Sequence, residues 1–360
     1  MKHSAAFRLI LFMGLSLSNT MGSGRAAAAA TPSCLPDTGQ TNHYTQTFGE
    51  DSDFSGRGPS YADNGDGTVT DQVTGLMWQK TDGGEMTWEQ AKEYARKLRL
   101  VGHQDWRLPA SMELFSIMNH GVSKPAMNTE YFTHTQAKYW WTDSPRADDG
   151  SRVWLVNSGG GIGAHSKRET LSAGGERLVH VRCVRGDSAF GAGPRLSDNG
   201  DGTVTDQRTG LIWQKIGAAS GMPWEEALKY CDGLKLAGQD GWRLPNIKEL
   251  RSVSDDRKVR PSLDKAFFPG AQAAYYWSST SQGDHPERAW FVDFVTGLVS
   301  YADKPEPHLV LAVRGGVAAP GSKLKPAPDP KLFTGSREGR GPGGGKGGKG
   351  ARPRPGGADQ

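Results

Sequence analysis

Two aspartate-rich blocks hold the side chains best suited to metal chemistry. Residues 63–71 and 198–206 both read DNGDGTVTD and place three carboxylates on a glycine-rich turn. Carboxylate oxygens are preferred ligands of calcium, but the spacing differs from that of an EF-hand loop, and the closing bidentate glutamate is missing. Aspartate and asparagine also bond their own backbone in turns. We therefore predict turns and no metal site at Asp63, Asp66, Asp71, Asp198, Asp201 and Asp206.

Catalytic patterns are missing from the chain. It contains no HExxH, CxxC or GxSxG motif, and its nine histidines lack the spacing of metal ligands. We therefore expect a protein that is not an enzyme and that needs no cofactor.

The aspartate-rich blocks open two copies of one long repeat. Residues 63–80 and 198–215 match at sixteen of eighteen positions, and the WRLP motif at 106–109 recurs at 242–245. Each copy is about 120 residues long, which is the usual size of one folding domain rather than of a solenoid repeat. We predict a signal peptide (1–30), an irregular N-terminal arm (31–61), a first domain (62–186), a linker (187–196), a second domain (197–316) and a disordered basic tail (317–360).

The local patterns indicate the same α+β order in each domain, with a hairpin, two helices and then a small antiparallel sheet. Thr87 with Gln90 and Asn246 with Glu249 form capping boxes at the starts of two helices. The expected strands are 68–71, 76–79, 139–142, 152–157 and 178–185 in the first domain, and 275–279, 289–294 and 309–314 in the second.

Most residues that both copies retain are expected to serve the fold. Large aromatic side chains fill small cores, and the repeated tryptophans are Trp78, Trp88, Trp106, Trp141, Trp213, Trp224, Trp242 and Trp277. Arg107 and Arg243, inside the WRLP motifs, are expected to pair with buried carboxylates rather than with a ligand.

Positions where the copies differ are better candidates for ligand binding. The loops after the aromatic strands carry different polar side chains in the two domains, and such loops often bind ligands. The candidates are Asp143, Arg146, Arg152, Asp284, His285 and Arg288.

The two ends of the chain indicate export and an affinity for anions. Lys2 and Arg8 precede a short apolar run that leads to an alanine-rich cleavage region, which is the pattern of a signal peptide. We therefore expect a periplasmic or extracellular protein. Residues 317–360 hold nine Lys or Arg against three Asp or Glu, a net charge of +6. Such a tail attracts anionic polysaccharide or a membrane surface, whereas export makes nucleic acid an unsuitable partner.

Several motifs together resemble the Lcl C-terminal domain family. They are the DNGDGTVTD block, the TGL-x-W-Q pair, the W-x-x-A helix, WRLP before an E-L helix, the aromatic strand and the closing V-R-G. The resemblance covers about 62–186 and 197–315 and implies two tandem C-type-lectin-like domains. The family's namesake is an adhesin that binds sulfated polysaccharides, so the resemblance implies adhesion or binding of an envelope glycan. The alternative is a structural or protein-binding subunit of an envelope complex.

The cysteines depart from the family pattern. Members usually carry one cysteine in the first helix and one in the last strand, but each domain here keeps only one, Cys231 or Cys183. An exported protein favours disulfides. A bridge between Cys183 and Cys231, a bridge from Cys34 to either, and free or intermolecular thiols all remain open.

Overall fold

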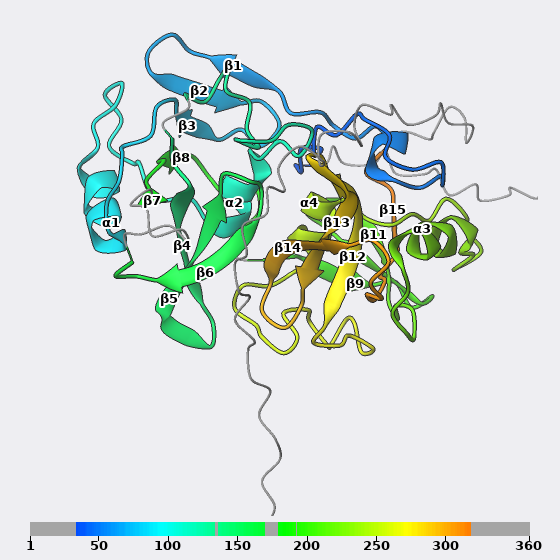
Figure 1. Ribbon diagram of the computed structural model, residues 1–360. Helices are drawn as coiled ribbons and strands as arrows, with labels where there is room; N and C mark the ends of the chain where they lie inside the picture. The colour runs from blue at the N-terminus through cyan, green and yellow to red at the C-terminus, as the bar shows by residue number, and fades with distance from the viewer. Residues whose placement is uncertain (1–33, 134–135, 170–178, 192, 318–360) are drawn as a thin grey trace, which may run out of the picture. The chain divides into compact units, whose positions relative to one another are not determined.

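The computed structural model of the chain describes residues 34–133, 136–169, 179–191 and 193–317 (Figure 1). The predicted signal peptide and nearly all of the predicted basic tail lie outside these residues. The elements of the first domain are β1 (Tyr61–Asp63), β2 (Thr68–Asp71), β3 (Met77–Gln79), α1 (Trp88–Lys97), α2 (Ser111–Ser116), β4 (Tyr139–Arg146), β5 (Asp149–Asn157), β6 (Ile162–Ser166), β7 (Val179–His180) and β8 (Val184–Arg185).

The second domain repeats this order, except that an isolated bridge between Tyr276 and Leu309 stands in place of β7. Its elements are β9 (Leu196–Asp198), β10 (Thr203–Asp206), β11 (Ile212–Gln214), α3 (Trp224–Gly233), α4 (Ile247–Ser252), β12 (Tyr275–Gln282), β13 (His285–Asp293), β14 (Leu298–Asp303) and β15 (Val313–Arg314). Short helices and mainly antiparallel sheets give the α+β class that the sequence predicts.

The repeated block forms the predicted hairpin at the start of each domain. In the first domain, Asp66 Oδ1 accepts a hydrogen bond from the backbone N–H of Thr68 at 3.0 Å. Gly75 has a φ of 76°, which a residue with a Cβ rarely adopts, and it turns the chain from β2 into β3. Val69 then lies opposite Trp78, and both are fully buried. The block therefore places a tryptophan in the core.

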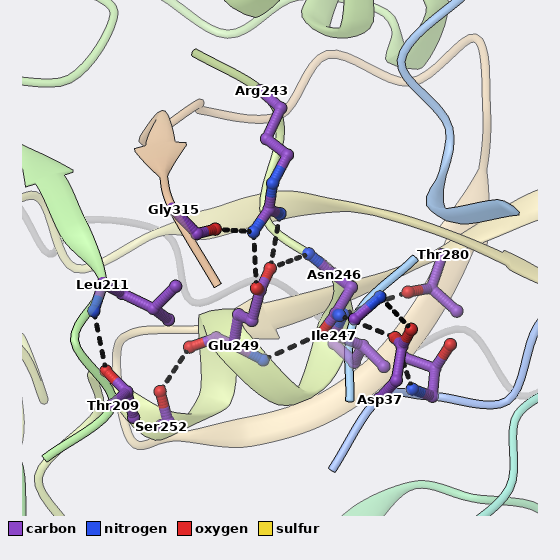
Figure 2. Close-up of polar contacts among 12 residues, drawn as sticks. Asp37, Thr209, Leu211, Arg243, Asn246, Ile247, Glu249, Ser252, Thr280 and Gly315 are labelled. Atoms are coloured by element: carbon purple, nitrogen blue, oxygen red, sulfur yellow. Dashed lines mark hydrogen bonds and ion pairs between the residues drawn. The ribbon is translucent and has the colours of Figure 1, made fainter. Parts of the chain in front are cut away.

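Both predicted capping boxes are present. Thr87 Oγ1 accepts a hydrogen bond from Gln90 N, and Gln90 Oε1 accepts one from Thr87 N. At the start of α4, Asn246 Oδ1 accepts from Glu249 N at 2.9 Å, and Glu249 Oε2 accepts from Asn246 N at 2.9 Å (Figure 2). These bonds satisfy N–H groups that a helix start leaves without partners.

One seven-stranded sheet is shared by the two domains. Its strand order is β12-β13-β14-β6-β5-β4-β7, and β14 meets β6 where Val299 lies opposite Ile162. The expectation of a separate small sheet in each domain was therefore wrong. The sequence does not indicate β6 or β14, because IGAHS and LVSYAD are short and mix apolar with polar residues. Their pairing depends on strands far away in the chain.

The apolar core consists of one cluster shared by the two domains and one further cluster in each domain. One apolar cluster contains residues of both domains, including Trp78 and Trp213. A second cluster surrounds Trp141 in the first domain, and a third surrounds Trp277 in the second. All eight repeated tryptophans are buried, which confirms their predicted role in the core.

The N-terminal arm packs against the second domain. The Gln40 side chain donates to the carbonyl of Ser281 at 2.8 Å and accepts from its N–H at 3.0 Å. Asp51 Oδ2 accepts from Thr280 Oγ1 at 2.6 Å. Apart from the 3-10 helix η1 (Asp51–Asp53), the arm is irregular up to β1. Side-chain contacts rather than regular structure hold it in place.

Within the described ranges, no helix has the length and apolar character needed to cross a membrane.

Candidate functional site

The aspartates of the repeated blocks are already occupied by local contacts. Asp63 Oδ1 accepts from Gly65 N at 3.0 Å and its other oxygen pairs with Lys80. Asp198 makes the equivalent contacts with Gly200 and Lys215. The predicted interpretation as turns is confirmed, and the duplicated lysines neutralise the carboxylates.

The two arginines of the WRLP motifs pair with glutamates, as predicted. Arg107 forms two hydrogen bonds to Glu113, at 2.7 and 2.8 Å, and these bonds are the main cause that raises the pKa of Arg107. Arg243 forms two bonds of 2.6 Å to Glu249 and a third, of 2.7 Å, to the carbonyl of Gly315 (Figure 2). Arg107 likewise donates to the carbonyl of Gly186 at 3.0 Å, so both arginines tie the second helix of their domain to the residue that follows its last strand.

All three cysteines are free thiols. Cys183 lies in the first-domain cluster and Cys231 in the second-domain cluster, so the structure contains no bridge between them. Burial raises the pKa of Cys183 to about 12 and raises the pKa of Cys231 as well. Cys34 is half-buried, with its Sγ directed at the carbonyls of Ala189 and Arg208. Such thiols are poor nucleophiles.

The six predicted ligand-binding residues fall into two groups. Asp143, Arg146 and Arg152 belong to the β4–β5 hairpin, and Asp284, His285 and Arg288 belong to the β12–β13 hairpin. Every pairing along the sheet from β12 to β4 is antiparallel, so β12 and β4 run in opposite directions. The turns of the two hairpins therefore lie at opposite ends of the strands of this sheet. As a result, the six residues do not form one surface.

Most of these side chains have a charged neighbour. The closest N–O distances are 2.6 Å for Arg146–Asp148, 3.5 Å for Arg152–Asp149, 3.4 Å for Asp284–Lys124, 3.2 Å for His285–Glu287 and 3.0 Å for Arg288–Asp303. Asp143 differs because burial raises its pKa, an effect that the nearby Lys92 and Arg107 partly offset. Exposed ion pairs of this kind are weak, so they leave the side chains able to exchange partners.

A small cavity lies beside the tip of the β12–β13 hairpin, and we call it the tyrosine cavity. It encloses about 220 Å³ and is lined by residues of both domains: Ser123, Lys124, Asn157, Gly159, Gly161, Gln282, Asp284, Trp290, Val299, Ser300 and Tyr301. Tyr301 is 43 % exposed, and the Arg288 guanidinium lies 5.4 Å from its ring centre. Gln282 Oε1 is buried and has no hydrogen-bond partner among the described residues.

A larger groove of about 470 Å³ lies between the domains, and we call it the interdomain groove. The first domain contributes Ala110, Ser111, Met112, Asp143, Ser144, Pro145 and Ala147; the linker contributes Phe190, Gly191, Gly193 and Pro194; the second domain contributes Asp206, Arg208, Thr209, Arg251, Ser252, Ser254, Asp256 and Arg257. Among the predicted residues, Asp143 lines this groove and Asp284 lines the tyrosine cavity. Arg146, Arg152, His285 and Arg288 line neither cavity, although the Arg288 guanidinium lies over the ring of Tyr301.

Tyr301 and Gln282 are site residues that the sequence argument missed. Their first-domain counterparts are Ala164, which lies opposite Trp154 as Tyr301 lies opposite Trp290, and Arg146, so the two copies differ at both positions. The same comparison would have found Tyr301 if β14 had been recognised as a strand.

A further polar cluster lies within the arm. His43 Nδ1 is 3.4 Å from Glu50 Oε1, 3.5 Å from Asp53 Oδ1 and 3.0 Å from Ser52 Oγ. The two carboxylates also accept backbone N–H groups of the arm. A catalytic triad places its hydroxyl and its carboxylate on opposite ring nitrogens, whereas all three groups here face Nδ1. The cluster therefore serves to fold the arm.

Comparison with known families agrees with this duplicated architecture. The family model described as the Lcl C-terminal domain matches residues 67–185 and again residues 202–314. No curated protein matches the chain.

Proposed function

The chain belongs to the Lcl C-terminal domain family, and from that premise we propose that it is an exported, non-enzymatic binding protein. Its ligand is an anionic polysaccharide of an envelope or surface, held by two C-type-lectin-like domains in an adhesive role. The observation that carries the proposal is the tyrosine cavity, where an exposed aromatic ring adjoins several polar groups.

The composition of this cavity suits a charged sugar. An aromatic ring offers an apolar face together with a polar hydroxyl, and ligand pockets combine such surfaces with a few polar groups that set orientation. Gln282 supplies an unpartnered buried oxygen for a sugar hydroxyl. Lys124 in the lining and Arg288 over the Tyr301 ring supply cations whose ion pairs are partly solvent-exposed, so a sulfate or carboxylate can replace their present partners at small cost.

A glycan array with the exported protein tests the proposal. We expect retention of sulfated or uronic polysaccharides, both with the full chain and with a chain ending at residue 316. The proposal fails if neither form retains any glycan. N-terminal sequencing of protein from the periplasm and the medium tests export; a start near Thr31 is expected, and an intact Met1 contradicts it.

The second candidate is a subunit that binds another envelope protein. The interdomain groove favours it, because the groove is large enough for several side chains and has both apolar and charged walls. Stoichiometric capture of one envelope protein, without glycan binding, would support this candidate over the first.

A further inference from the structure

The arm of this chain shows how one domain holds a peptide segment. The segment contacts the start of α4, where Figure 2 shows Asp37 beside Asn246, and it also lies next to the end of α2. Asn246 Nδ2 donates to Asp37 Oδ1 at 3.2 Å, and Lys248 Nζ donates to the carbonyls of Asp37 and Ser116, each at 2.8 Å. Thr38 continues the contact, because its carbonyl accepts from His120 N at 2.8 Å. The groove between the start of α4 and the end of α2 is therefore already filled by a peptide segment of the same chain, and we call it the filled groove.

The interdomain groove has the same construction with the roles of the domains exchanged. Ala110, Ser111, Met112 and Ser144 stand where the filled groove has Asn246, Ile247, Lys248 and Thr280, and Ser252 and Asp256 stand where it has Ser116 and His120. The linker forms part of its lining, and no described segment of the chain fills its volume. The duplication therefore gives the protein two related grooves, of which its own arm occupies one.

Among the described residues, one hydroxyl group in the interdomain groove lacks the hydrogen-bond acceptor that its counterpart has in the filled groove. In the filled groove, Thr280 Oγ1 accepts from Ile247 N at 3.0 Å and donates to the carboxyl group of Asp51 at 2.6 Å. In the interdomain groove, Ser144 Oγ accepts from Ser111 N at the same distance, 3.0 Å. No described residue accepts the hydrogen of Ser144. A carboxylate from outside the chain would complete the arrangement.

The remaining lining indicates the rest of the ligand. Met112, Pro145 and Phe190 offer apolar surface, and Arg208 is the repeat counterpart of the uncharged Val73. Among the described residues no carboxylate forms an ion pair with the Arg208 guanidinium, whose Nε donates to the carbonyl of Gly193 at 3.0 Å. An arginine in this setting favours a carboxylate. Asp143 on the opposite wall disfavours one, and its counterpart in the second domain is Ser279.

We propose that the interdomain groove binds a short acidic peptide segment of a partner protein, whose Asp or Glu carboxylate accepts a hydrogen bond from Ser144 as Asp51 does from Thr280. Apolar residues of the same segment pack on Met112, Pro145 and Phe190. This inference does not depend on glycan binding at the tyrosine cavity, because the two cavities share no lining residue.

The test uses a labelled synthetic peptide with the sequence of residues 35–53, which contains both Asp37 and Asp51. Its binding to the intact exported protein is measured by fluorescence anisotropy. We expect Ser144→Ala to weaken binding about tenfold, because it removes a hydrogen bond to a charged group. An Asp51→Asn peptide should also bind about tenfold more weakly, because its amide oxygen still accepts the hydrogen bond but carries no negative charge. Ser144→Thr should retain the affinity, and Asp143→Ser should increase it about two- to fivefold.

Thr280→Ala is the matched control in the filled groove and should leave peptide affinity unchanged. The proposal is overturned if the peptide does not bind, if Thr280→Ala rather than Ser144→Ala weakens binding, or if Asp143→Ser weakens it. Displacement of the peptide by a sulfated polysaccharide would assign the groove to glycan instead. Self-association of the protein that disappears in Ser144→Ala would assign it to a second copy of this chain.

Discussion

Arg243 and Arg107 make the same paired contact in different surroundings. The side chain of Arg243 is 3 % exposed and that of Arg107 is 37 % exposed, whereas their glutamates are both buried. A buried charge that loses its partner is costly, while water partly replaces the partner of an exposed one. The two copies therefore allow a direct comparison of how burial of the arginine changes the contribution of the ion pair to stability.

We predict that Glu249→Ala lowers the free energy of unfolding by about 3–5 kcal/mol, because it leaves Arg243 buried without a counter-charge. Glu113→Ala should cost less, since Arg107 reaches water. Urea denaturation of both variants measures the difference. Equal losses, or a larger loss for Glu113→Ala, would show that burial of the arginine does not control the energy of the pair.

The buried carboxyl group of Asp51 helps to attach the arm to the second domain. Asp51 accepts hydrogen bonds from Thr38 and Thr280 and is almost fully buried. Burial, and then the neighbouring Asp37, raise the pKa of Asp51 to about 8. The folded protein therefore holds a proton that the unfolded chain releases above about pH 4.

This shift predicts a pH-dependent contribution to stability. The contribution of Asp51 is fully present below about pH 4 and is lost as the pH rises through about 8. Asp51→Asn keeps an oxygen for both threonines but cannot ionise. We expect the free energy of unfolding of the wild type, measured relative to Asp51→Asn, to fall between pH 4 and pH 8. A difference that stays constant across this range would show that Asp51 is ionised throughout.

Local elements were predictable because their causes lie close together in the sequence. Thr87 and Gln90 are three residues apart, as are Asn246 and Glu249, so both capping boxes can be read directly. The path of the arm was not predictable, because Gln40 meets a backbone 241 residues away. The candidate site was found only in part for the same reason: Asp284 was identified, whereas its neighbour Tyr301 lies on a strand defined by distant pairing.

At the scale of the whole molecule, the two domains share their sheet and their largest apolar cluster. Val299 and Ile162 join the strands of the two domains, while Trp78 and Trp213 belong to one core. Separating the domains would expose apolar surface and leave β6 and β14 with unpaired edges.

We therefore predict a single cooperative thermal transition for the full protein, although two-domain chains often show more than one. The isolated segment 62–186 should melt at a lower temperature or self-associate. Differential scanning calorimetry with sedimentation analysis measures both properties. Two separate transitions, together with isolated domains as stable as the whole chain, would contradict the shared core.

The central functional claim concerns the tyrosine cavity. Tyr301 and Tyr275 are similarly exposed, at 43 % and 47 %, but only Tyr301 lines the cavity. The most direct test is calorimetric titration of a sulfated polysaccharide into the wild type, Tyr301→Ala and Tyr275→Ala. An aromatic anchor of a binding site typically contributes enough that its loss weakens affinity about tenfold or more. We predict such a loss for Tyr301→Ala and an unchanged affinity for Tyr275→Ala; equal affinities of all three proteins, or no binding by the wild type, would contradict the claim.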